Sequence, residues 1–142
     1  MITIEPFRPE HVLDMDSHVE PLLGTKDGLF AMAQINAQGP GWTGFAEGRI
    51  IGACGIRPMW PGTGEAWGIF SPLLYKYRFS AVKYIRRGMP MLIESQGLQR
   101  VQATINASNP RALSFAKTLG FTEEGLMVKY HCGCDYWMVS RT

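Results

Sequence analysis

Residues 109–121, NPRALSFAKTLGF, decide the fold, because they carry the signals of a helix with two defined ends. Asn109 is a favoured N-cap residue, since its side-chain oxygen can accept a backbone N–H of the first turn. Pro110 suits the first helical position, which needs no N–H. Gly120 suits the left-handed residue that ends a helix, and Phe121 can pack back on the last turn. The stretch therefore predicts a helix that runs directly into a strand. Its apolar face is formed by Ala112, Phe115, Ala116 and Leu119.

Length and composition indicate one compact domain that covers all 142 residues, 1–142. Hydrophobic residues make up 46% of the chain and charged residues 18%, which excludes a disordered chain. The formal net charge is only +2 and no apolar run could span a bilayer, so we expect neither a nucleic acid nor a membrane partner. Three cysteines make no disulfide framework, and the N-terminus carries no secretion signal, so we expect a cytoplasmic protein.

Hydrophobic periodicity and turn residues place the other elements. Residues 58–64 are rich in Pro and Gly and are expected to form a loop, not a strand. Pro90 lies inside a helical stretch and is expected to kink or break it. The expected strands are 2–5, 42–47, 50–57, 65–71, 100–105, 121–130 and 135–140. One helix is expected to start at 8–10, and three others are expected at 28–38, 76–97 and 109–120.

The capped stretch resembles the N-x-x-A-x-x-φ-x-x-x-G-F signature of the GNAT (GCN5-related N-acetyltransferase) superfamily, and the order of elements agrees over nearly the whole chain. Residues 120–140, GFTEEGLMVKYHCGCDYWMVS, are similar to the ribosomal-protein-type and phage-encoded branches. The resemblance implies an α+β fold with a mixed, mostly antiparallel sheet flanked by helices, whereas periodicity alone supports only α+β or α/β. It also implies acetyl transfer from acetyl-coenzyme A to a primary amine.

In that family a Q/R-x-x-G-x-G/A loop after the fourth strand holds the coenzyme A pyrophosphate on backbone N–H groups at a helix N-terminus. Carried onto this chain, Lys76 takes the first position and Ala81 the last. Phe79 stands where the first glycine belongs, and its ring would crowd a phosphate on its N–H. The side chains of Arg78 and Ser80 could then hold the phosphate together with Lys76.

Two other interpretations of this segment stay open. The basic residues can simply form a solvated face of the helix. Phe79 can be a core anchor of that helix rather than an obstacle to phosphate. The apolar stripe that it would join is Val82, Ile85, Met89 and Leu92.

The resemblance also implies that the fourth strand splays away from the fifth and pairs with the pantetheine arm. The residues in place for this are Ile69, Phe70 and Ser71. Asn106 ends the fifth strand, and with Asn109 it could bond the pantetheine amides. For Asn109 the alternative is a capping role alone.

The catalytic residues are less clearly marked. Many family members protonate the leaving thiolate with a Tyr at the position of Ala116, so this chain departs from that pattern. The resemblance, in which a Glu on the fourth strand can deprotonate the amine through water, makes Glu65 the candidate general base, with an exposed strand-edge carboxylate as the alternative. Ser114, on the same helix as Ala116, is a second candidate, with a plain surface serine as the alternative.

No histidine or cysteine cluster predicts a further site. His11 and His18 are interpreted as surface residues, although either could line the acceptor side. Residues 131–135, HCGCD, hold four ligand-type side chains at an expected hairpin tip, but no second pair completes a zinc site, so we expect no metal.

The sequence leaves the acceptor open, as a small-molecule or a protein amine, and it leaves the oligomeric state open as well. It also leaves a rival to the enzyme: a catalytically decayed GNAT-like module for structure or interaction, such as a phage internal virion protein. The location would then be a virion instead of the cytoplasm.

Overall fold

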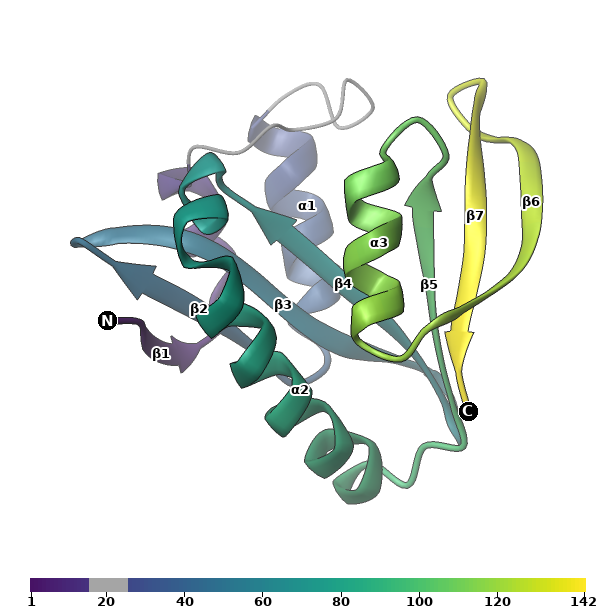
Figure 1. Cartoon of the computed structure of the whole chain (residues 1–142), viewed down its shortest axis with the longest axis horizontal. Coiled ribbons are helices and arrows are strands. Elements are labelled where there is room, and N and C mark those ends of the chain that lie inside the picture. Colours follow the sequence, from purple (N-terminus) through teal and green to yellow (C-terminus); the bar gives the residue numbers. More distant parts are fainter. Residues whose placement is uncertain (16–25) are drawn as a thin grey trace.

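The computed structural model describes residues 1–15 and 26–142 of the chain. One mixed sheet forms the centre of the molecule. Within these residues seven strands lie in the order β1-β2-β3-β4-β5-β7-β6 (Figure 1). The β4–β5 pair is parallel and the other pairs are antiparallel, which confirms the mixed, mostly antiparallel sheet. The strands are β1 (Thr3–Pro6), β2 (Gly41–Ala46), β3 (Arg49–Trp60), β4 (Thr63–Phe70), β5 (Arg100–Asn106), β6 (Thr122–His131) and β7 (Cys134–Arg141).

Helices cover both faces of this sheet (Figure 1). On one face lie α2 (Arg78–Ser95) and α3 (Pro110–Thr118), whose apolar side chains enclose buried Val101 and Val139. On the other face lie α1 (Lys26–Asn36) and the 3₁₀ helix η1 (Pro9–Asp14), around Val12 and Ala33. A second 3₁₀ helix, η2 (Pro72–Tyr77), joins β4 to α2. No helix in the described ranges is both long and apolar enough to cross a membrane. Expectations for His18 fall outside the described residues.

The expected loop at 58–64 is wrong, because β3 and β4 continue through most of it and turn at Pro61 and Gly62. Pro58 lacks an N–H, yet it pairs in register with Gly64. The N–H of Ile56 points to the β2 side, where it donates at 3.0 Å to the carbonyl of Pro40, the residue just before β2. Because residues two apart in a strand face the same edge, the nitrogen of Pro58 points to the same edge as that of Ile56. At Pro58 this edge lies beyond the end of β2, so no strand is there to accept a hydrogen bond.

In helix α2 the structure excludes a break at Pro90, one of the two outcomes expected there, and it corrects the interpretation of Phe79. It runs through Pro90 without a break, since the Arg86 carbonyl that loses its partner lies on an exposed part of the helix where water can bond it. Phe79 is not a core anchor, because it is 77% exposed. It lies in the first turn of α2, where buried Ala81 and apolar residues of η2 fill the core instead. The rest of the predicted stripe does pack on the core: Val82, Ile85, Met89 and Leu92.

Helix α3 has both of its predicted caps. The Asn109 side-chain oxygen accepts the Ala112 N–H at 3.1 Å. At the other end Gly120 has φ +96°, and the Phe121 N–H donates to the Ala116 carbonyl at 3.1 Å, which closes a Schellman motif. The caps confirm the prediction from residues 109–121 and fix where α3 stands beside β5.

Candidate functional site

The parallel strands β4 and β5 separate after a short paired stretch. They share three residue pairs at their N-terminal ends, of which the last is Glu65–Gln102. Beyond it β4 stays paired with β3 up to Phe70, and β5 stays paired with β7 up to Asn106. Each strand therefore turns one unpaired backbone edge toward the other (Figure 1). We call the two diverging stretches, residues 66–70 and 103–106, the β4–β5 fork.

The register of β3 and β4 decides which backbone groups face the fork. The Ser71 N–H donates to the Ile51 carbonyl on β3 at 3.0 Å. Successive strand residues point their N–H and C=O groups to opposite edges, so Ile69 and Ser71 direct theirs to β3. Gly68 and Phe70 direct theirs into the fork. Gly68 is accordingly exposed although it lies in an inner strand. Of the three residues predicted to pair with pantetheine, the structure turns only the backbone of Phe70 into the fork.

The open end of the fork carries two arginines and two aromatic rings. The Arg78 guanidinium carbon lies 4.7 Å from the ring centre of Tyr75 and 4.6 Å from that of Phe79. Arg111, in the first turn of α3, lies 5.0 Å from the same Tyr75 ring. Among the described residues neither arginine has a carboxylate partner. We call these four residues the mouth cluster, and its unneutralised guanidinium groups could bind an anion.

Arg111 and Tyr75 were not predicted from the sequence. They are far apart along the chain and no motif joins them. They meet because η2 follows the end of β4 while α3 follows the end of β5.

Lys76 points away from the fork. Its amine lies 3.0 Å from the Glu47 carboxylate in the β2–β3 turn, and the Tyr77 hydroxyl donates to the same oxygen at 2.6 Å. The hydrogen bond from Tyr77, and then that from Lys76, lower the pKa of Glu47, and the bond to Glu47 raises the pKa of Lys76. Of the other residues predicted to hold the pyrophosphate, Ser80 is exposed and Ala81 is buried in the core.

Both predicted asparagines lie at the fork, in local hydrogen bonds. The Asn106 side-chain oxygen accepts the Ser108 N–H at 2.9 Å and the Ser108 hydroxyl at 2.8 Å. The Asn109 oxygen caps α3, as described above. The Asn106 oxygen thus has both acceptor positions filled and that of Asn109 has one, and both side chains can offer a ligand their amide NH₂ group.

Glu65 is buried, so an exposed strand-edge carboxylate is wrong. It is 8% exposed and accepts a hydrogen bond from the Arg57 guanidinium at 2.6 Å. Arg57 also donates to the Asn36 side-chain oxygen of α1 at 3.4 Å. The carboxylate thus lies where the fork begins, on the α1 face of the sheet, with a cation already bound to it.

Ser114 and Ala116 lie on different sides of α3. Ala116 is buried against the core, while Ser114 is exposed, about 200° around the helix. The Ser114 carbonyl accepts the Thr118 hydroxyl at 3.0 Å. The structure therefore directs the Ser114 side chain away from the sheet and the fork.

His11 is buried, so the interpretation as a surface histidine is wrong for this residue. It is 4% exposed, and its Nδ1 shares a 2.7 Å hydrogen bond with the hydroxyl of buried Thr43 on β2. Burial, and then the nearby charge of Arg8, lower the pKa of His11 below its ordinary value. The neutral ring is the form that fits this site.

This burial predicts a loss of stability in acid. Because the folded pKa of His11 lies below the unfolded value, its contribution is complete above about pH 6.5 and is lost as pH falls from there through the folded pKa. Urea unfolding measures the free energy of unfolding at pH 7.5 and at pH 5.0. Between these two pH values His11→Gln should lose less of this free energy than the unchanged protein. Equal losses in the two proteins would contradict the assignment.

The hairpin between β6 and β7 turns at Cys132 and Gly133, with φ +50° and +76°. Cys132 is exposed, and its sulfur lies 3.5 Å from the His131 Nδ1. Within residues 1–15 and 26–142 no three His, Cys, Asp or Glu side chains gather as a metal site. That the protein carries no metal stays a prediction.

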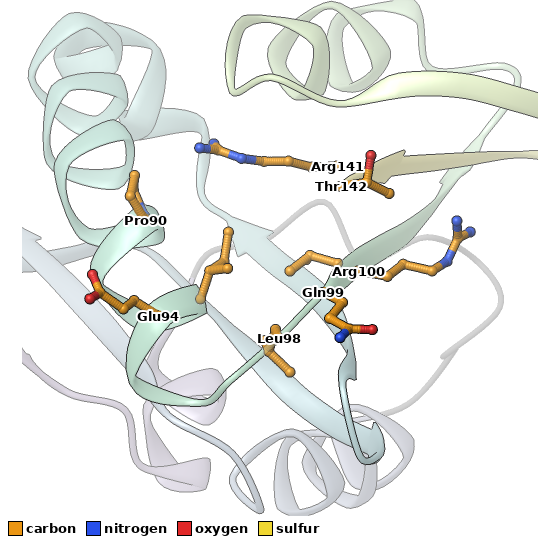
Figure 2. A pocket seen from close by; sticks show the side chains of 9 residues that line it. Pro90, Glu94, Leu98, Gln99, Arg100, Arg141 and Thr142 are labelled. Atoms are coloured by element: carbon orange, nitrogen blue, oxygen red, sulfur yellow. The ribbon is translucent and has the colours of Figure 1, made fainter.

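A pocket of about 240 Å³ lies between the C-terminal part of α2 and the adjoining ends of β5 and β7, and Figure 2 shows the side chains that line it. Its two arginines are already engaged. Arg141 donates to the Leu119 carbonyl at 2.8 Å, and Arg100 binds the Glu124 carboxylate at 2.9 Å. In this pocket Arg100 is neutralised by a carboxylate, whereas Arg141 is held by a backbone carbonyl, as Arg78 is by that of Tyr75 at 2.7 Å.

Comparison with known proteins places the fold. No protein-family model matches the sequence, and a search of curated proteins finds no significant match. Solved structures do match. A chimera of the Vibrio cholerae spermidine N-acetyltransferase and hSSAT superposes with a TM-score of 0.73 at 16% identity, covering 99% of this chain and 94% of the other.

Two further structures agree. A GNAT-family acetyltransferase from Bacillus anthracis gives a TM-score of 0.72 at 15% identity, over 98% of this chain and 93% of the other. An IAA acetyltransferase from Bacillus cereus gives 0.73 at 15% identity, over 99% of each chain. At these identities the likeness concerns the fold, and the chain has the fold of the GNAT acetyltransferases.

Proposed function

We propose that this protein transfers an acetyl group from acetyl-coenzyme A to a primary amine. The observation that carries the proposal is the β4–β5 fork, which turns the unpaired backbone of Gly68 and Phe70 toward a parallel neighbour. An extended amide chain such as pantetheine can add to a free strand edge as a further strand does. The fold of solved acetyltransferases supports the same conclusion.

The chain's own groups fit such a donor at three places. Backbone groups of Gly68 and Phe70 can bond the pantetheine amides. The NH₂ groups of Asn106 and Asn109 lie at the same end of the fork. The arginines of the mouth cluster can bind the phosphates, which replaces the missing glycine loop with side-chain charge. The donor supplies a thioester carbonyl that a neutral amine can attack.

Proton transfer has fewer candidates. Glu65 remains the proposed base for the amine, through water, because it lies where the fork begins. Its bond to Arg57 orients the carboxylate, but it also occupies one oxygen. Ala116 cannot protonate the thiolate, and Ser114 faces solvent, so this step is assigned to water.

A thermal-shift experiment tests donor binding. Acetyl-coenzyme A at 100 times its dissociation constant should add about 2.7 kcal/mol to the free energy of unfolding. For a domain of this size that corresponds to roughly 10 °C in Tm. ADP at the same concentration is the control, since it supplies phosphates without pantetheine. An unchanged Tm with millimolar acetyl-coenzyme A would overturn the proposal.

A non-catalytic module remains the second candidate, and one contact favours it. The rings of Phe70, at the end of β4, and Phe115, on α3, meet with their centres 5.5 Å apart, so the two sides of the fork are already linked without a donor. Thiol release from acetyl-coenzyme A with a panel of amines, including spermidine and a peptide, separates the two candidates. Donor binding without acceptor-dependent thiol release is expected of the module.

A further inference from the structure

One pair of aromatic rings crosses the fork on the α3 side. Phe70 belongs to β4, and Phe115 belongs to α3, which follows β5. Their rings meet edge to face, with centres 5.5 Å apart and planes at 71°. Edge-to-face contact at this distance is a favourable geometry for aromatic rings. The two sides of the fork, which share no backbone hydrogen bonds there, are therefore joined through side chains.

Two glycines form a seat for the Phe70 ring. A Cβ at Gly52 would lie 2.5 Å from the Cδ1 atom of Phe70, and a Cβ at Gly68 would lie 2.7 Å from its Cε2 atom. The ring thus lies flat against the backbone of β3 and β4. It lies on the Cβ side of Gly68, one of the two residues whose backbone groups face the fork, while Gly68 itself stays exposed.

A second contact crosses the fork at its outer end. The Arg111 guanidinium of α3 lies 5.0 Å from the ring centre of Tyr75 in η2. Both groups are exposed. An exposed cation–π contact is weak, and a phosphate competes for the same guanidinium with a full negative charge.

We propose that these two contacts form a gate that holds the fork closed in the ligand-free protein. The inference rests on the proposed donor site and assigns its regulation. Phosphates of the donor draw Arg111 away from Tyr75, and the pantetheine arm then displaces the Phe70 ring from its glycine seat. The free energy of opening is taken from the binding free energy, so the closed state weakens apparent donor affinity.

Removal of the ring tests the gate. If the open state makes up no more than about a tenth of the ligand-free protein, Phe70→Ala should tighten coenzyme A binding roughly tenfold or more. In stopped-flow experiments the observed association rate should level off with coenzyme A concentration in the unchanged protein and rise linearly in the variant. Tyr84→Ala, which removes an exposed ring elsewhere on α2, should leave both quantities unchanged.

A second variant opens the gate without removing the ring. Gly52→Ala places its Cβ against Phe70 and should push the ring off its seat, again with tighter binding. Equal or weaker binding by both variants, with binding by the unchanged protein intact, overturns the gate and leaves the donor site standing. Binding by neither the variants nor the unchanged protein overturns both. Binding by the variants alone would contradict the proposal that the donor opens the gate.

Discussion

Arg57→Leu is expected to lower the free energy of unfolding by about 3–5 kcal/mol, because it leaves the buried carboxylate of Glu65 without its cation. Urea unfolding at pH 7 measures the loss. The double variant Arg57→Leu, Glu65→Leu removes both charges and should recover most of it, since well-packed apolar residues can replace a buried ion pair at little cost. A double variant no more stable than Arg57→Leu would contradict this reason, because removal of the unpaired carboxylate would then bring no gain in stability.

The same variants separate structure from catalysis at Glu65. If Glu65 serves only the ion pair, the folded double variant should retain acetyl transfer. If it also accepts the proton of the amine, the double variant should be folded, should bind acetyl-coenzyme A normally and should transfer the acetyl group far more slowly. Normal binding with slow transfer cannot come from instability.

The second large effect is expected at the mouth cluster. Arg78→Gln combined with Arg111→Gln should weaken coenzyme A binding by at least a hundredfold, because each hydrogen bond to a charged phosphate contributes about 1.5–3 kcal/mol. Loss of Arg111 also removes its contact with Tyr75, which makes the gate easier to open. An exposed cation–π contact contributes only about 0.5–1 kcal/mol, so the phosphate contacts prevail.

Salt dependence gives this prediction an independent readout. Exposed charges are screened by salt, so affinity should fall between low and physiological salt in the unchanged protein and fall less in the double variant. A matched control removes two exposed cations elsewhere, with Arg86→Gln and Lys129→Gln. An equal loss of affinity in the control would mean that overall charge, not the mouth cluster, attracts the donor.

The sequence was sufficient to predict those features of the fold that depend on residues close together in the chain. The caps of α3 depend on Asn109 and Gly120 alone, and both behave as predicted. The apolar stripe of α2 is likewise a matter of spacing. The interpretation of Phe79 as a core residue is wrong because its burial depends on where α2 begins relative to the sheet. The position of η2 decides this, and no local sequence pattern reveals it.

Distant partners explain the other differences. Pro58 is accommodated in β3 because β2 ends before it, and this depends on how two strands align. His11 is buried by Thr43, and Glu65 by Arg57 and Asn36, over separations that sequence periodicity does not cover. Both polar contacts lie on the face of the sheet that η1 and α1 cover, since His11 belongs to η1 and Asn36 to α1.

The candidate site shows the same division. The resemblance to a family predicted a fork between the fourth and fifth strands, and the short β4–β5 pairing is in place. Which residues face it depends on register, so Gly68 joins Phe70 where Ile69 and Ser71 were expected. Arg111 and Tyr75 could not be paired from the sequence, because only the fold brings the ends of β4 and β5 together.

The measurement that tests the central claim most directly is a titration of ¹⁵N-labelled protein with acetyl-coenzyme A, followed through backbone amide chemical shifts. The amides of Gly68 and Phe70 should shift with a single dissociation constant, together with those of Arg78 and Arg111, because the donor is proposed to pair with the free edge of β4 and to reach the mouth cluster. Amides of β1 should stay unchanged. No shift at millimolar acetyl-coenzyme A, or shifts confined to the pocket beside Pro90, would contradict the account.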